Sequence, residues 1–159
     1  MSLRLHLIAT GDRPPRWVAD GFDDYARRLA GDVTLRLVEV EAARRAKGAD
    51  VARAVADEGK RLIAAVPTSA RVVALAVDGQ AWSTADLATR LAAWAADGRD
   101  VALLVGGPDG LAQACMERAE ERWSLGPLTL PHMLVRVIVA EALYRAWSVR
   151  AGHPYHRAG

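Results

Sequence analysis

Apolar positions in the first half of the chain recur with two different periods. Alternation of apolar and polar residues predicts strands, and recurrence every three or four residues predicts helices. The elements predicted in this way are strands over residues 3–8 and 33–40 and helices over 17–29 and 51–66. Pro14 and Pro15 suit the start of the first helix, and Pro67 suits the end of the second.

Two nearly continuous apolar runs in the second half, 71–77 and 100–105, are typical of parallel strands buried on both faces. Ser83 and Asp86 form a capping-box pattern at the start of a helix between these runs. The other elements predicted here are a glycine-rich turn over 106–110, a helix from Leu111 and a long helix over 133–149.

Strands that alternate with helices imply an α/β fold, with a mostly parallel sheet flanked by helices. A chain of 159 residues fits one domain, so we expect a single domain over residues 1–159. Ligands of such sheets bind outside the carboxyl ends of the strands. The loops at 75–79 and 105–110, where the two buried strands are predicted to end, are therefore the first candidates for a binding crevice.

Two segments near these strand ends have an unusual composition. The turn Gly-Gly-Pro-Asp-Gly over 106–110 would let the backbone approach a ligand closely. It is neither a Walker loop nor a dinucleotide fingerprint, and taken alone it predicts only a tight strand-to-helix turn. Residues 124–132 are apolar, contain one glycine and two prolines, and predict a short strand with a constrained loop.

The composition is that of an ordinary globular protein, with 52% hydrophobic and 25% charged residues. No apolar run approaches the ~20 residues of a membrane helix. The N-terminus has no signal-peptide core, so we expect a cytoplasmic protein with no membrane contact. The single cysteine, Cys115, excludes an internal disulfide and fits a reducing compartment. No Cys and His cluster resembles a metal site, so no metal is expected.

The net charge of +2 is too small to indicate nucleic-acid binding, but its placement is informative. Glu141 is the only acid after Glu121, whereas arginines and histidines continue to the end of the chain. The terminal segment 153–157 combines Arg, which suits phosphate, with Tyr, which suits stacking on a base. A second basic patch either follows a phosphate backbone or is a solvated surface, and its members are Arg44, Arg45 and Lys47.

A series of motifs resembles, in order and spacing, the SPOUT class of methyltransferases, and within it the family that methylates N3 of one pseudouridine in 23S ribosomal RNA. The motifs lie at 105–110, 123–125, 128–132, 135–137, 141–147 and 153–157, and in the N-terminal half at Trp17, 21–22, Tyr25, 27–28 and 47–50. The resemblance covers essentially the whole chain. It implies a SPOUT-type fold with a deep trefoil knot over about 71–159, S-adenosylmethionine as the cofactor and no metal.

The resemblance also implies that three loops hold the cofactor. Matched residue by residue, these loops contribute Leu75, Gly106, Leu125, Gly126, Pro127, Leu128, Thr129 and Leu130. Apolar walls and backbone hydrogen bonds suit a neutral adenine and a thioether, which agrees with the absence of a lysine from the glycine-rich turn.

Methylation at N3 requires that the N3 proton leave, helped by a base or by groups that stabilise the anion. The catalytic candidates are Tyr155, His156 and Arg157 of the terminal segment, and the candidates for contact with RNA are Arg136, Arg145 and His153. Arg145 has an alternative role in an ion pair with Glu141, one turn earlier. The sequence does not assign the base.

The resemblance implies a homodimer in which the substrate surface of one subunit lies beside the cofactor of the other. The helix over 133–149 is apolar around much of its circumference, which fits burial in a core or a dimer contact. We therefore expect a homodimer that acts on 23S rRNA within the assembled ribosome. Two alternatives stay open: another α/β enzyme that uses a nucleotide at the same strand ends, and a non-catalytic ribosome-binding module.

Overall fold

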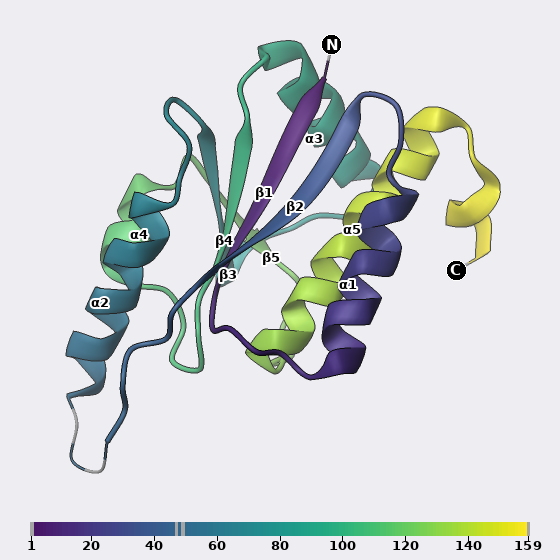
Figure 1. The fold of residues 1–159 in the computed structure, drawn as a ribbon. Helices are drawn as coiled ribbons and strands as arrows, with labels where there is room; N and C mark the ends of the chain where they lie inside the picture. Colours follow the sequence, from purple (N-terminus) through teal and green to yellow (C-terminus); the bar gives the residue numbers. More distant parts are fainter. Residues whose placement is uncertain (1, 47, 49, 159) are drawn as a thin grey trace.

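The computed structural model describes residues 2–46, 48 and 50–158 and contains a five-stranded sheet between two layers of helices (Figure 1). The strands are β1 (Leu3–Thr10), β2 (Val33–Val40), β3 (Arg71–Ala81), β4 (Val101–Val105) and β5 (Glu121–Ser124). The helices are α1 (Arg16–Arg28), α2 (Val51–Ala64), α3 (Thr84–Asp97), α4 (Gln113–Arg118), α5 (His132–Ala151) and the 3₁₀ turn η1 (Pro154–Ala158). All pairings are parallel in the order β2-β1-β4-β3-β5, which confirms the α/β prediction.

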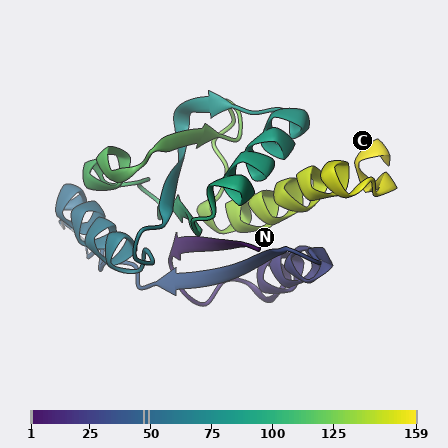
Figure 2. The same ribbon diagram turned by 90° about the horizontal axis from the view of Figure 1, so that it is seen from above.

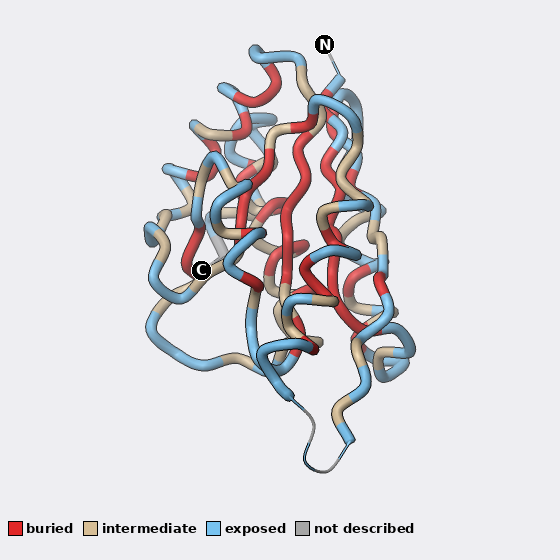
Figure 3. Tube along the Cα trace, turned by 90° about the vertical axis from the view of Figure 1, so that its left-hand side faces the viewer, coloured by how far each residue is buried: buried red, intermediate tan, exposed pale blue. Residues whose placement is uncertain are grey.

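The two faces of the sheet are covered by different helices. Helices α1, α3 and α5 pack together over one face, and α2 and α4 cover the other (Figures 1 and 2). Buried residues concentrate on the central strands, and every residue of β4 is buried (Figure 3). Burial on both faces explains why the sequence of β4 is an unbroken apolar run.

Local signals in the sequence set several helix ends. The Ser83 hydroxyl accepts from the Asp86 amide at 3.0 Å and the Asp86 carboxylate accepts from the Ser83 amide at 3.0 Å, so the capping box at α3 is confirmed. Pro15 precedes α1, as expected of a proline at a helix start. Helix α3 ends at Gly98 and α5 at Gly152, both in the left-handed conformation that glycine adopts without strain.

The strand predicted to end at residues 75–79 is longer in the structure. β3 continues to Ala81, because its pairing with β5 resumes at Gln80 after an irregularity that follows Leu75. Gly79 sits where a β-carbon would meet the backbone carbonyl carbon of Arg122 at 2.7 Å, so only glycine allows this close approach. The helix predicted from Leu111 begins two residues later, because α4 starts at Gln113 and has six residues.

Among the helices that the structure describes, none is long and apolar enough to cross a membrane. The trefoil knot predicted for the C-terminal part is not tested by these strand pairings and stays a prediction.

Candidate functional site

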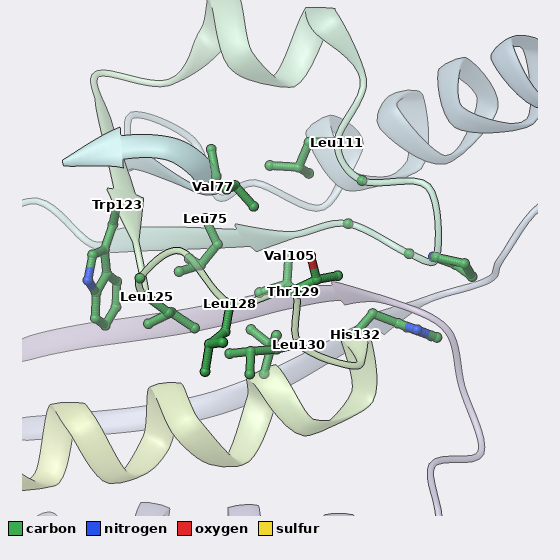
Figure 4. Close-up of a pocket in the computed structure, with 17 residues that line it drawn as sticks. Leu75, Val77, Val105, Leu111, Trp123, Leu125, Leu128, Thr129, Leu130 and His132 are labelled. Carbon is green, nitrogen blue, oxygen red and sulfur yellow. The ribbon is translucent and has the colours of Figure 1, made fainter. Parts of the chain in front are cut away.

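A cavity of about 270 Å³ opens at the carboxyl ends of β4 and β5, beside the irregular stretch of β3 that follows Leu75 (Figure 4). This stretch of β3, the loops after β4 and β5 and the first turn of α5 form its walls. Its lining residues are Leu75, Ala76, Val77, Val105, Gly106, Gly107, Pro108, Gly110, Leu111, Trp123, Leu125, Gly126, Leu128, Thr129, Leu130, His132 and Val135.

The glycine-rich turn gives the cavity a wall made of backbone. A β-carbon on Gly106 would lie 2.4 Å from the carbonyl carbon of Gly110 and 2.8 Å from the Leu111 nitrogen. Gly110 has φ of +82°, and its amide donates to the Gly107 carbonyl at 3.1 Å. The turn therefore folds back on itself in a way that requires glycine at both ends.

Seven of the eight residues expected to hold the cofactor line this cavity: Leu75, Gly106, Leu125, Gly126, Leu128, Thr129 and Leu130. Pro127 is not part of the lining. Val105, Trp123 and Val135 also line the cavity, although the sequence did not assign them to the cofactor, because apolar residues of this kind are indistinguishable from core in sequence. The structure thus brings the predicted cofactor loops together.

The lining has no Lys, Arg, Asp or Glu, and its only titratable side chain is His132. Burial lowers the pKa of His132 below its ordinary value, and the nearby positive charge of Arg136 lowers it further. His132 is both the first residue of α5 and part of the cavity lining, and its neutral form is favoured at pH 7.

Arg136 was expected to contact RNA, and its burial contradicts that role. The side chain is 1% exposed, its Nη1 lies 2.6 Å from Glu39 of β2, and its Nη2 donates to the carbonyl oxygens of Thr10 and Gly11. The guanidinium therefore ties α5 to the ends of β1 and β2 and is not open to a nucleic acid. The sequence gave no indication that Arg136 would pair with Glu39, which is 97 residues away.

The C-terminal segment folds back as η1 against α1 and α5. The Tyr155 ring lies 4.6 Å from the Tyr144 ring centroid, its hydroxyl is 3.3 Å from the Tyr25 hydroxyl, and the guanidinium carbon of Arg145 is 5.0 Å from its centroid. Burial and the hydrogen bond with Tyr25 raise the pKa of Tyr155 to about 12. Tyr155 is therefore protonated at neutral pH.

Arg145 lies beside this aromatic cluster and forms the ion pair with Glu141 that was its alternative role. Its Nε donates to Glu141 at 2.7 Å, and the side chain is 26% exposed, so one face of the guanidinium stays open. His153 and Arg157 are exposed, and the half-buried His156 has an Nδ1 with no hydrogen-bond partner among the residues described. These groups form a cationic and aromatic surface at the end of the chain.

One chain does not bring the two groups of predicted site residues together. The cavity lies at the start of α5 and the terminal segment follows its end (Figure 1). The Tyr155 ring packs against Tyr144, which lies 12 and 9 residues along α5 from the cavity residues His132 and Val135. At 1.5 Å per residue, roughly 14–18 Å of helix therefore separates the cavity from the terminal segment.

The two described members of the second basic patch differ in their surroundings. Arg45 is bonded to Glu58 and Asp109, whereas Arg44 is exposed. Lys47 lies outside the described residues. Within the part of the chain that the structure describes, no group of three or more His, Cys, Asp or Glu side chains is placed to hold a metal ion.

The fold and the cavity define a class that sequence comparison also identifies. A family model described as "Predicted SPOUT methyltransferase" matches residues 3–156, and the chain belongs to this family of methyltransferases. It is 58% identical over 156 residues to Ribosomal RNA large subunit methyltransferase H of Alkalilimnicola ehrlichii, a match that covers 98% of this chain and 100% of that one.

A solved structure has the same overall fold at low sequence identity. A probable methylase family protein from Haemophilus influenzae Rd KW20 superposes with a TM-score of 0.50 and 16% identity, covering 96% of this chain and 69% of that chain. This likeness supports the fold alone.

Proposed function

We propose that this chain transfers a methyl group from S-adenosylmethionine to N3 of one pseudouridine in 23S rRNA, acting in the cytoplasm on the assembled ribosome as one domain over residues 1–159. The observation that carries the proposal is the uncharged cavity at the carboxyl ends of β4 and β5, beside β3. It occurs in a chain that is 58% identical to a large-subunit rRNA methyltransferase over its whole length. The family's trefoil knot is part of the same proposal.

The lining of the cavity fits the chemistry of the cofactor. Leu75, Leu125 and Leu130 supply apolar walls for the adenine and thioether, and the backbone at Gly106 supplies hydrogen bonds at close range. The cofactor supplies an electrophilic methyl group. Catalysis at such a site depends mainly on the alignment of the acceptor nitrogen with that group.

The terminal segment supplies the groups that a pseudouridine substrate needs. N3 must lose its proton, and a protonated Tyr155 with a pKa of about 12 donates a hydrogen bond and does not remove that proton. Arg157 and the open face of Arg145 provide positive charge for the N3 anion or for neighbouring phosphates. His153 is exposed beside them and suits a contact with the RNA backbone.

A homodimer would unite the two halves of the site. The roughly 14–18 Å of helix between cavity and tail within one chain exceeds the ~3 Å that reacting atoms need, whereas a partner subunit would place its tail at the cavity. Exposed apolar side chains at the rim, Val77 and Leu128, are 71% and 75% exposed in the single chain and are consistent with cover by a partner. Light scattering at micromolar concentration should give the mass of a dimer, and a monomer would contradict this part of the proposal.

The function is tested by transfer of labelled methyl from S-adenosylmethionine to ribosomes that lack the modification. Assembled ribosomes, free large subunits and naked RNA are compared as acceptors. Label in a single pseudouridine, strongest with assembled ribosomes, is expected. Ribosome binding without label would favour a non-catalytic binding module. Binding of another nucleotide in preference to S-adenosylmethionine would favour a different α/β enzyme.

A further inference from the structure

Arg45 joins the loop before α2 to the glycine-rich turn of the cavity. Its Nη1 and Nη2 atoms lie 2.6 Å and 2.9 Å from the two carboxylate oxygens of Glu58 in α2. Its Nε donates to Asp109 at 2.7 Å. One guanidinium therefore connects two carboxylates from different elements, and Asp109 is 64 residues away in sequence.

Glu58 is a fixed anchor for this arginine. It is 2% exposed, and the same oxygen that meets Arg45 also accepts from the Ala43 amide at 2.9 Å. Burial acts to raise the pKa of Glu58, but the bonds from Arg45 and Ala43 outweigh it and the pKa is lowered. The carboxylate is therefore ionised, and both of its oxygens have donors, so Arg45 has little freedom to leave it.

Asp109 belongs to the 106–110 turn, and the other four residues of this turn line the cavity. Gly106, Gly107, Pro108 and Gly110 line it, and Asp109 does not, because its carboxylate bonds Arg45. Glu58 also lies directly beside the turn, since a β-carbon added to Gly107 would be 3.4 Å from its Oε1. The turn is rich in glycine, so without such bonds it would have many accessible backbone conformations.

We propose that Arg45 is a positioning residue for the cofactor site, which holds the 106–110 turn in its binding shape through the Glu58–Arg45–Asp109 bridge. The identity of the ligand rests on the proposed function, whereas the effect on the turn does not. The basic patch over 44–47 then divides by role: Arg45 acts inward on the cavity, and Arg44 faces solvent.

Two measurements test the bridge, with Arg44→Ala as the matched control for an exposed arginine at the adjacent position. The first is hydrogen exchange of the amides of 106–111 in the protein without ligand. The second is the affinity for S-adenosylmethionine by calorimetry, with kcat and KM for the cofactor. Asp109→Ala cuts the bridge at its 39% exposed end and leaves the Glu58–Arg45 pair intact.

We expect Asp109→Ala to exchange faster over 106–111 and to bind the cofactor about fivefold more weakly, the upper end for an ion pair between partly exposed partners. KM for the cofactor should rise by a similar factor with kcat nearly unchanged, and Tm should stay at the wild-type value. Arg45→Lys should keep the charge opposite Glu58, and so recover the Tm that Arg45→Ala loses. The turn should still exchange fast, because one ammonium does not span both carboxylates.

Normal exchange and normal affinity in Asp109→Ala would overturn the proposal and leave Arg45–Glu58 as a structural ion pair only. The same losses in Arg44→Ala would also overturn it, because they would indicate a general effect of surface charge. If the wild-type protein did not bind S-adenosylmethionine, the proposed function would fail, and the exchange measurement would still decide the role of Arg45.

Discussion

The two ends of α5 carry opposite kinds of surface. At its start, the cavity is lined by leucines, glycines and one histidine whose pKa is lowered, with no charged residue in the lining. At its end, Tyr155 packs among Tyr25, Tyr144 and Arg145, and two further cationic or titratable side chains stay exposed. One helix therefore connects an apolar pocket to an aromatic and cationic surface.

This contrast separates two recognition problems. A small ligand with a flat ring is held by shape and backbone hydrogen bonds, which glycines and leucines supply. A nucleic acid is held by positive charge and stacking, which arginines and tyrosines supply. The two surfaces are separated by roughly 14–18 Å of α5 in one chain, which is the reason for the proposal that a second copy completes the site.

The largest effect should come from two variants, one that lacks the terminal segment and one whose cavity is blocked. A chain ending at Gly152 should bind cofactor but lose at least about 100-fold in methyl transfer, because the aligned catalytic groups are gone. Gly106→Val should lose cofactor binding. When the two inactive proteins are mixed and allowed to exchange subunits, about one quarter of the wild-type activity should return, since half of the dimers contain one intact site. No recovery on mixing, despite proven subunit exchange, would show that each chain works alone.

The next effect concerns only the apolar end. Gly106→Ala should weaken cofactor affinity on the order of tenfold to a hundredfold, because the new β-carbon would overlap the backbone at Gly110 and Leu111. Ribosome binding should persist, because the terminal surface is untouched. Gly31→Ala is the control: Gly31 has φ of +69° but no neighbour within 4 Å, so the change strains the backbone away from the cavity. Calorimetry that found equal affinities for both variants would refute a backbone wall at Gly106.

A smaller effect is expected at the aromatic end from Tyr155→Phe. The ring keeps its contact with Tyr144, and the variant loses only the hydroxyl that lies 3.3 Å from Tyr25. Turnover should fall about fivefold, the cost of roughly one hydrogen bond, whereas Tyr155→Ala should fall much further. A complete loss in the Phe variant, measured as single-turnover methyl transfer, would assign the hydroxyl a direct part in proton transfer.

The smallest effect is a pH dependence at the apolar end. The pKa of His132 is lowered in the folded protein, so its neutral form is favoured there. The free energy of unfolding should therefore be unaffected by His132 above its ordinary value of 6.5 and should decrease as the pH falls below it. Denaturant unfolding of wild type and His132→Gln at pH 7.5 and 5.5 measures this, and an equal pH dependence in both would exclude His132 as the cause.

Elements with local signals could be predicted from the sequence. The apolar run of β4, the capping box at Ser83 and the long helix near the end each depend on residues close together in the chain. The glycine-rich turn could also be predicted as a wall of the crevice, because parallel strands end at the same edge of a sheet. The loop after β5 was assigned to the same site only by the family resemblance.

Features that depend on partners far away could not be predicted. Arg136 and Arg45 looked like surface cations, and both are bonded to carboxylates, at Glu39 and at Glu58 and Asp109. The extension of β3 to Ala81 depends on a glycine that lets the backbone of Arg122 approach. Nothing in the local sequence distinguishes an arginine that meets a distant carboxylate from one that faces water.

The ion pair between Arg136 and Glu39, with the bonds to the end of β1, has a consequence for the order in which the chain is made. Proteins emerge from synthesis N-terminal end first, so β1 and β2 are exposed long before α5 exists. Until α5 has been made, the cavity lacks the wall that α5 supplies, and the ends of β1 and β2 lack the bonds from Arg136. A nascent chain in which α5 has not yet been made therefore lacks both of the surfaces at the two ends of this helix.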